Sequence, residues 1–293
     1  STPIETRIGT APGLIVEHGG GVVYAIPGVP AEMREMMSRA VLPDLARRAG
    51  TTAVTRTRVV RVSGMAESSI AEALSPLWRS LDDAPVKMSY LAGGGEVRVR
   101  ITAKALDAAA ADALLDPVER SIRETLGTAV VGTGDATLES VVGDLLKEVR
   151  ATLAVAESVT GGGVAERITR IPGSSAYFAG GVVAYDPAVK TALLGVDPAL
   201  IEMDGVVSER VALAMARGVR ERTGATVGLA LTGAAGPDAH GGMPPGSVWI
   251  AVDDASASAA RLVRYASDRA AVRGFATTAA LNLLRLHLSE ARR

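Results

Sequence analysis

The chain has 293 residues, of which 48% are hydrophobic and only 3% aromatic, and its formal net charge is −1. The length suggests two or three domains, and the composition supplies a sizeable core of mainly aliphatic side chains. The near-zero net charge excludes a global basic field that would attract nucleic acid or an anionic membrane. Because the chain has no cysteine, disulfides, thiolate metal sites and a cysteine nucleophile are also excluded.

No apolar run approaches the roughly 20 residues that are needed to span a bilayer. The first residues, STPIETRIG, lack the charged and apolar regions of a signal peptide. We therefore expect a cytoplasmic protein whose partners include neither a membrane nor nucleic acid.

Residues 1–49 are predicted to form two short strands, at 14–17 and 22–26, followed by a helix over 31–48. Two strands and one helix cannot bury a core by themselves. We interpret this part as the end of a larger α/β domain whose first part is missing.

Residues 50–131 have the pattern of a small, self-contained α+β domain. Strands are expected at 57–62, 86–91, 96–103 and 129–131, and helices at 67–77 and 107–126. This βαββα order, closed by a short last strand, is typical of a two-layer sandwich. We find no cluster of catalytic side chains in it.

Residues 135–293 alternate between helices and strands and predict a layered α/β/α domain, which gives the chain an α/β fold class. Helices are expected at 137–150, 160–170, 187–194, 209–222 and 270–288, and strands at 153–156, 181–185, 226–231, 247–252 and 260–265. In such sheets the site lies beyond the carboxyl ends of the strands.

A glycine-rich turn follows the apolar strand at 153–156 and contains Ser158, Thr160, Gly161 and Gly162. A strand that turns through small residues into a helix leaves backbone N–H groups free, which predicts an anion site. The structural alternative is an ordinary strand–turn–helix in which the glycines serve tight packing.

A second turn of the same kind, at 231–237, contains Thr232 and Gly233. If it lies beside the first turn, the two would form a pocket rich in N–H and O–H donors, suited to a phosphate or an oxyanion. Arg269 opens the last helix, where a bound phosphate would offset its unfavourable interaction with the helix dipole. The alternative for Arg269 is a solvated helix face.

Asp186 and Pro187 predict a helix start, with Tyr185 just before it and Lys190 in its first turn. Side chains at those two positions meet in most helices. The helix dipole would lower the pKa of Lys190, and a neutral lysine is a usable general base. The alternative is a surface lysine whose ammonium reaches solvent.

Ser174 and Ser175 supply the candidate nucleophile, with Lys190 as its base, although either serine could simply cap a short helical turn. Of the three histidines only His240 lies in a suitable loop, which disfavours a Ser-His-Asp triad. No spacing of His, Asp and Glu in this domain matches a metal site, so metal-free chemistry is predicted.

Six motifs resemble, in order, those of the CinA C-terminal domain, which is the nicotinamide-nucleotide amidohydrolase (NMN deamidase) domain of the CinA family. They are AESVTGGGVAERIT, PGSSAYFAGGVVAYDPAVK, DGVVSERVA, LTGAAGPD, GSVWIAV and DRAAVR. Upstream, GTAPG and PGVPAEMREM resemble the last motifs of the molybdopterin-binding-like (MoaB-type) domain of that family, and residues 50–131 resemble its middle domain.

The resemblance implies hydrolysis of nicotinamide mononucleotide to nicotinic acid mononucleotide and ammonia, in pyridine nucleotide recycling. It implies that Ser175 is the nucleophile, Lys190 the base and Tyr185 the residue that assists the base. Val159 stands where many members carry cysteine. The expected substrate-binding set comprises Ser158, Thr160, Gly161, Gly162, Ser174, Thr232, Gly233 and Arg269.

The domains expected from the resemblance are the C-terminal part of a MoaB-like domain (1–49), the middle domain (50–131) and the amidohydrolase domain (135–293). We expect no cofactor for the last domain, a divalent metal only for a complete MoaB-like domain, and a homodimer. Two alternatives stay open. One is a non-catalytic nucleotide sensor linked to competence or damage response, and the other a metal-dependent ADP-ribose pyrophosphatase, if the natural protein has a complete MoaB-like domain.

Overall fold

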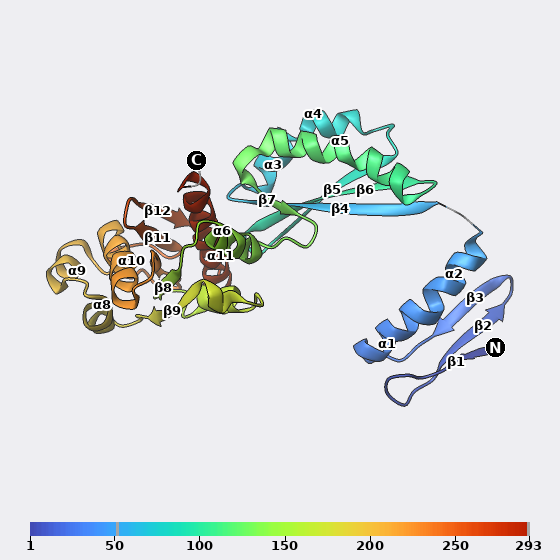
Figure 1. Ribbon diagram of the computed structural model, residues 1–293, viewed down its shortest axis with the longest axis horizontal. Helices are drawn as coiled ribbons and strands as arrows, with labels where there is room; N and C mark the ends of the chain where they lie inside the picture. The colour runs from blue at the N-terminus through green and yellow to red at the C-terminus, as the bar shows by residue number, and fades with distance from the viewer. Residues whose placement is uncertain (51–52, 292–293) are drawn as a thin grey trace. The chain divides into compact units, whose positions relative to one another are not determined.

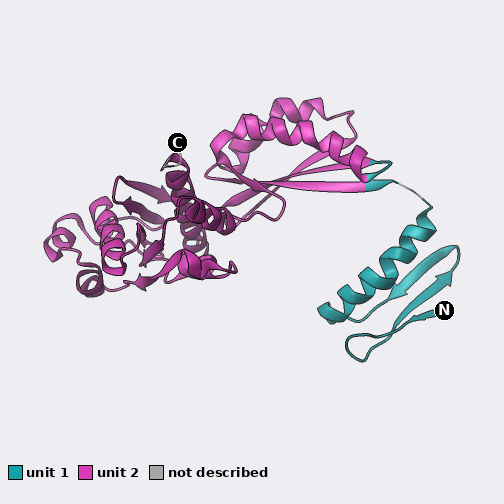
Figure 2. Cartoon of the chain, viewed as in Figure 1, with its two compact units in different colours: residues 1–54, 105–107 teal, residues 55–104, 108–293 magenta. Residues whose placement is uncertain are grey.

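The computed structural model describes residues 1–50 and 53–291 (Figure 1). The chain divides into two compact units, residues 1–54 with 105–107 and residues 55–104 with 108–293 (Figure 2). Within the described residues, no helix combines the length and the apolar character that crossing a membrane requires.

The first unit is a small antiparallel sheet with one helical segment. Its strands follow the chain in the order β1 (Thr2–Ile4), β2 (Gly13–His18) and β3 (Gly21–Ala25). The helical segment runs through α1 (Pro30–Met36), a π-helical turn (Met37–Val41) and α2 (Leu42–Ala49). The predicted strands and helix are present, whereas the sequence pattern predicts neither β1 nor the π-helical turn.

The second unit begins with a sheet in the strand order β5-β6-β4-β7 and three helices. The elements are β4 (Val54–Ser63), α3 (Glu67–Ala73), α4 (Ser75–Ser80), β5 (Val86–Gly93), β6 (Glu96–Ala105), α5 (Ala108–Leu126) and β7 (Val130–Thr133). The single helix predicted at 67–77 is instead divided into two, because Pro76 lacks the N–H that would continue α3 and lies in the first turn of α4, which begins at Ser75.

The rest of the second unit is built around a mixed sheet with the strand order β12-β11-β10-β8-β9. Strand β8 pairs in parallel with both β9 and β10, and β11 and β12 extend the sheet antiparallel. The strands are β8 (Leu153–Glu157), β9 (Phe178–Val183), β10 (Val227–Ala234), β11 (Ser247–Asp254) and β12 (Ser258–Arg264).

Helices cover both faces of this sheet, so the predicted α/β/α layering is confirmed. The helices are α6 (Leu138–Glu148), α7 (Gly163–Thr169), α8 (Pro187–Leu194), α9 (Pro198–Asp204), α10 (Glu209–Thr223) and α11 (Arg269–Ala291). Leu153 and Val155 of β8 pack in one core with α6, α7 and α11, and Ala154 and Ala156 pack in the other with α8 and α10. Strand β8 is therefore buried on both sides, as its unbroken apolar run predicts.

Two local predictions differ from the structure. Strand β9 lies three residues earlier than predicted at its start, because the run from Phe178 to Tyr185 is apolar or small throughout and marks no boundary. Helix α9 is missing from the predicted elements, although Asp197 caps it and Pro198 opens it, which is the same signal that correctly predicts α8.

Candidate functional site

The parallel strands β8, β9 and β10 have their carboxyl ends on the same side of the domain, and a cavity of about 350 Å³ opens beyond these ends. Ser158 follows β8 directly, Tyr185 follows β9 and Gly233 lies at the end of β10. The lining comprises Ser158, Val159, Tyr185, Asp186, Pro187, Gly233, Ala234, Ala235, Gly236, Pro237, Asp238, Ala239, His240 and Arg269. The site therefore lies at the edge that the topology predicts.

Lys190 is held in the first turn of α8 and is fully buried, with 0% of its surface exposed. The helix starts as predicted, because the Asp186 side chain accepts a hydrogen bond from the N–H of Ala188. The Lys190 amine lies 3.1 Å from the Ser158 hydroxyl oxygen, 2.6 Å from the carbonyl oxygen of Ala184 and 3.3 Å from that of Tyr185. The surface alternative for Lys190 is thus excluded by its burial.

Burial lowers the pKa of Lys190 to about 8, and the charge of Asp186 opposes this shift. The predicted direction is right, but the main cause is desolvation rather than the helix dipole. A neutral amine has two N–H donors and one lone pair. In the structure the amine donates to the carbonyls of Ala184 and Tyr185 and to the Ser158 hydroxyl oxygen. A neutral amine can keep both carbonyl bonds and accept the hydroxyl proton of Ser158 with its lone pair.

The predicted pairing of Lys190 with Ser174 or Ser175 is wrong. Both serines lie in a short 3₁₀ turn, Ser174–Ala176, directly before β9, whereas Lys190 comes after that strand. At about 3.3 Å per residue, a strand of this length separates its two ends by roughly 20 Å. Ser175 is exposed at the opposite edge of the sheet, so no hydroxyl of that turn reaches the amine within this chain.

The Tyr185 side chain also does not meet the Lys190 amine as predicted. Its phenol is 60% exposed and its hydroxyl accepts a hydrogen bond of 2.7 Å from Arg269. Arg269 also donates to the carbonyl oxygen of Gly236 at 3.0 Å. The two side chains together form part of the cavity wall and present a cation there.

The glycine-rich turn after β8 is filled by the carboxylate of Glu157. That side chain, 1% exposed, accepts hydrogen bonds from the Thr160 hydroxyl (2.6 Å) and from the N–H groups of Gly162 (3.1 Å), Val164 (3.0 Å) and Ala165 (2.9 Å). The expected anion site at the start of α7 is therefore wrong, because the protein's own carboxylate occupies its donors. An acidic residue at the end of a buried apolar strand is the sequence signal for this arrangement.

Thr160, Gly161 and Gly162 consequently do not line the cavity. Arg273 closes the turn from outside by donating to the carbonyls of Val159 (3.2 Å) and Thr160 (2.8 Å). Gly161 and Gly162 have φ values of 62° and 100°, which L side chains rarely adopt. The segment is thus an ordinary strand–turn–helix, as the structural alternative has it, but these two glycines are required by the backbone conformation of the turn.

The second turn reaches the cavity through Gly233 and the residues after it, but not through Thr232. The Thr232 side chain is buried and donates to the carbonyl of Val206 at 2.8 Å. His240 lines the cavity in the loop where it is expected, next to Asp238. Among the described residues, no group of three or more His, Asp or Glu side chains could hold a metal ion.

Two family models match this chain. The model of the CinA C-terminal domain matches residues 135–288, and that of the damage-inducible protein CinA KH domain matches residues 57–132. The most similar relatives include a CinA-like protein of Frankia casuarinae, 49% identical over 98% of this chain, and one of Salinibacter ruber, 42% identical over 98%. The chain covers 66% and 69% of these relatives, so it spans about two thirds of their length.

Solved structures match about half of the chain in fold. One is a competence-damaged protein (CinA) superfamily protein of Klebsiella pneumoniae, with 28% identity and a TM-score of 0.51 over 52% of this chain and 96% of that one. Another is a competence or damage-inducible protein of Enterobacter asburiae, with 26% identity and a TM-score of 0.50 over 53% and 99%.

Proposed function

The chain belongs to the CinA family, and from that premise we propose that its C-terminal domain hydrolyses the carboxamide of nicotinamide mononucleotide. The products are nicotinic acid mononucleotide and ammonia. The observation that carries the proposal is the buried amine of Lys190, 3.1 Å from the Ser158 hydroxyl at the edge of a cavity. A hydroxyl beside a neutral amine is the pairing that amide hydrolysis by a Ser–Lys mechanism needs.

In this mechanism Ser158, rather than Ser175, is the nucleophile. Its oxygen attacks the carboxamide carbon while its proton passes to Lys190, which gives a tetrahedral intermediate. Lys190 then returns the proton to the amide nitrogen, the C–N bond breaks and ammonia leaves. Water attacks the resulting ester with Lys190 again as the base, which releases the acid and restores the Ser158 hydroxyl.

The backbone N–H of Val159 is suited to stabilise the negative oxygen of the intermediate. Within the part of the chain that the structure describes, this N–H makes no hydrogen bond, and Val159 lines the cavity. In hydrolases whose serine follows a strand and precedes a helix, the N–H after the nucleophile serves in this way. Removing one such donor typically reduces kcat by about 10²–10³-fold.

Arg269 is suited to hold the 5′-phosphate, since its exposed guanidinium lines the cavity beside the Tyr185 hydroxyl. An arginine binds a phosphate through a charge-assisted, commonly bidentate contact. The start of α7 does not compete for this role, because Glu157 already occupies its N–H donors.

The direct test is to incubate the purified protein with nicotinamide mononucleotide and to measure ammonia and nicotinic acid mononucleotide over time. Turnover that survives a metal chelator supports the metal-free Ser–Lys reaction. Tight binding of the nucleotide without any turnover would instead support the sensor alternative. The assignment of residues 1–49 to a MoaB-like domain, the homodimer, the cytoplasmic location and the lack of a cofactor stay predictions.

A further inference from the structure

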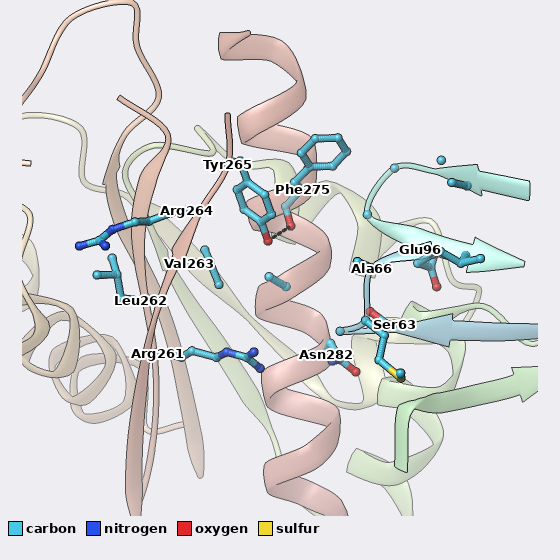
Figure 3. A pocket seen from close by; sticks show the side chains of 18 residues that line it. Ser63, Ala66, Glu96, Arg261, Leu262, Val263, Arg264, Tyr265, Phe275 and Asn282 are labelled. Carbon is cyan, nitrogen blue, oxygen red and sulfur yellow. Dashed lines mark hydrogen bonds between the residues drawn. The ribbon is translucent and has the colours of Figure 1, made fainter. Parts of the chain in front are cut away.

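A second and larger cavity, of about 730 Å³, lies within the second unit and shares no lining residue with the cavity at Ser158 (Figure 3). Its walls come from the turn between β4 and α3, the hairpin between β5 and β6, strand β12 and helix α11. This volume falls in the range of about 300–1,000 Å³ that is typical of small-molecule sites.

One wall of this cavity is aromatic and apolar. The rings of Tyr265 and Phe275 have centroids 5.3 Å apart, and Val263 and Ala279 continue the wall. The hairpin contributes Gly93 and Gly94, where an added Cβ would meet no atom within 4 Å, and Gly95, which packs against Phe275 and Thr278 of α11. A flat ring therefore finds both room and an aromatic surface on which to stack.

Polar groups without a partner lie at the same cavity. Ser63 is only 2% exposed, and its hydroxyl makes no hydrogen bond among the described residues. Asn282, 4% exposed, uses its amide oxygen to accept from Arg285, which leaves its NH₂ group free within the same residues. One carboxylate oxygen of Glu96 is buried without a partner. A buried polar atom such as this Glu96 oxygen is costly unless a ligand or water satisfies it.

Glu96 and Arg261 are two charged groups of the cavity lining. Burial raises the pKa of the Glu96 carboxyl, whereas Arg61 and Arg167, whose guanidinium lies 3.9 Å from the other carboxylate oxygen, act in the opposite direction. Arg261 lies on the exposed side of the site, and Figure 3 shows its side chain directed from β12 toward α11. Arg264, on the same strand, is directed to the other side of the sheet.

We propose that this cavity is a binding site for a nucleoside monophosphate, with the base at the aromatic wall and the phosphate at Arg261. The unpartnered groups of Ser63, Asn282 and Glu96 match the donors and acceptors along the edge of a heterocyclic base. The guanidinium of Arg261 matches the phosphate.

Ligand binding at this site should stabilise the contact between the hairpin and α11. The Thr278 hydroxyl of α11 donates to the carbonyl of Gly94 in the hairpin at 2.5 Å. Because the hairpin and α11 both line the cavity, a ligand there adds contacts to both sides of this junction. We expect slower amide exchange at residues 63–66 and 93–97 when the site is filled.

The experiment is calorimetric titration of the whole chain with adenosine 5′-monophosphate and guanosine 5′-monophosphate, with adenosine as the uncharged probe. We expect Arg261→Ala to weaken binding of the monophosphates about tenfold and to leave adenosine unchanged, since it removes one charge-assisted contact. Phe275→Leu should weaken all three probes. Arg170→Ala, at an exposed arginine that is not part of the cavity lining, is the matched control and should bind like the wild type.

Two results would overturn this proposal. One is no binding of either monophosphate at millimolar concentration by the wild-type chain, with thermal unfolding showing that it is folded. The other is binding that Arg261→Ala and Phe275→Leu leave unchanged, which would place the nucleotide elsewhere. The inference does not depend on the amidase reaction, because ammonia release and nucleotide binding at this cavity are measured separately.

Discussion

The amine of Lys190 lies 3.1 Å from the hydroxyl oxygen of Ser158, although 32 positions separate the two residues in the chain. Parallel pairing of β8 with β9 brings them together, because Ser158 follows the first strand and Lys190 follows the second. Sheet topology therefore brings the proposed nucleophile and base together, and their chemistry can be tested one residue at a time.

Replacing Lys190 by methionine should abolish most of the turnover of nicotinamide mononucleotide. Methionine has a side chain of similar length, which suits this fully buried position, but it removes the base. A general base typically contributes about 10²–10⁴-fold to the rate. Ammonia release measures the effect, and thermal unfolding checks that the variant is folded. Lys147→Met, at an exposed lysine that pairs with Asp144, is the control and should be near wild type.

The choice of nucleophile is tested by two alanine variants assayed side by side. Ser158→Ala should lose activity by orders of magnitude, because it removes the hydroxyl that the amine contacts. Ser175→Ala should remain close to the wild type, since that residue lies at the opposite edge of the sheet. The reverse pattern of rates would refute the mechanism while leaving the amidase activity itself in place.

The pH profile should report the titration of Lys190. With a pKa near 8, the amine is mostly protonated at pH 6 and cannot accept a proton, so kcat/KM should rise about tenfold per pH unit and level off above pH 8. The stability of the fold should also increase as the pH rises through this titration. The folded chain releases this proton at lower pH than the unfolded chain, so this residue's contribution to stability increases between about pH 8 and 10.5. A flat profile from pH 6 to 9 would contradict the assignment.

Glu157→Gln should destabilise the turn that carries Ser158. The amide keeps the size of the side chain but brings an NH₂ group against N–H donors, and an unsatisfied buried group costs about 1–3 kcal/mol. Chemical denaturation measures the loss. Glu166→Gln in the same segment, at an exposed residue paired with Arg170, should change stability little. Equal stability of the two variants would show that the Glu157 bonds contribute nothing net.

Arg269→Ala should separate phosphate recognition from chemistry. We expect KM for nicotinamide mononucleotide to rise about tenfold with a smaller effect on kcat, because the guanidinium binds the part of the substrate that does not react. With nicotinamide riboside, which has no phosphate, the variant and the wild type should have the same KM. An equal rise in KM for both substrates would show that Arg269 supports the structure of the cavity wall and does not bind the phosphate.

Much of the fold is predictable because local signals mark its elements. Asp186 and Pro187 fix the start of α8, Ser208 caps α10, and the unbroken apolar run of β8 predicts a strand that is buried on both faces. The site is predictable only in part. Hydrophobic pattern gives the strands but not which segments meet at their ends, so Ser175, closer to Lys190 in sequence, is the natural but mistaken partner.

The Gly-rich turn shows a second limit of sequence reasoning. Its glycines correctly predict a sharp turn into α7, and free N–H groups at a helix start generally attract an anion. The pattern alone does not reveal that Glu157, at the end of β8, supplies that anion from within the chain. Thr160 and Thr232 are assigned to the pocket for the same reason, because a hydroxyl's partner depends on tertiary contacts.

Glu157 also means that the turn carrying Ser158 is held in place from within the chain. A helix start that binds a substrate phosphate would become ordered only with the substrate, whereas the donors at the start of α7 are already satisfied by this carboxylate. The geometry around Ser158 should thus be the same with and without a ligand. An inhibitor that mimics only the nicotinamide ring, with no anionic tail, would meet a site that is already assembled.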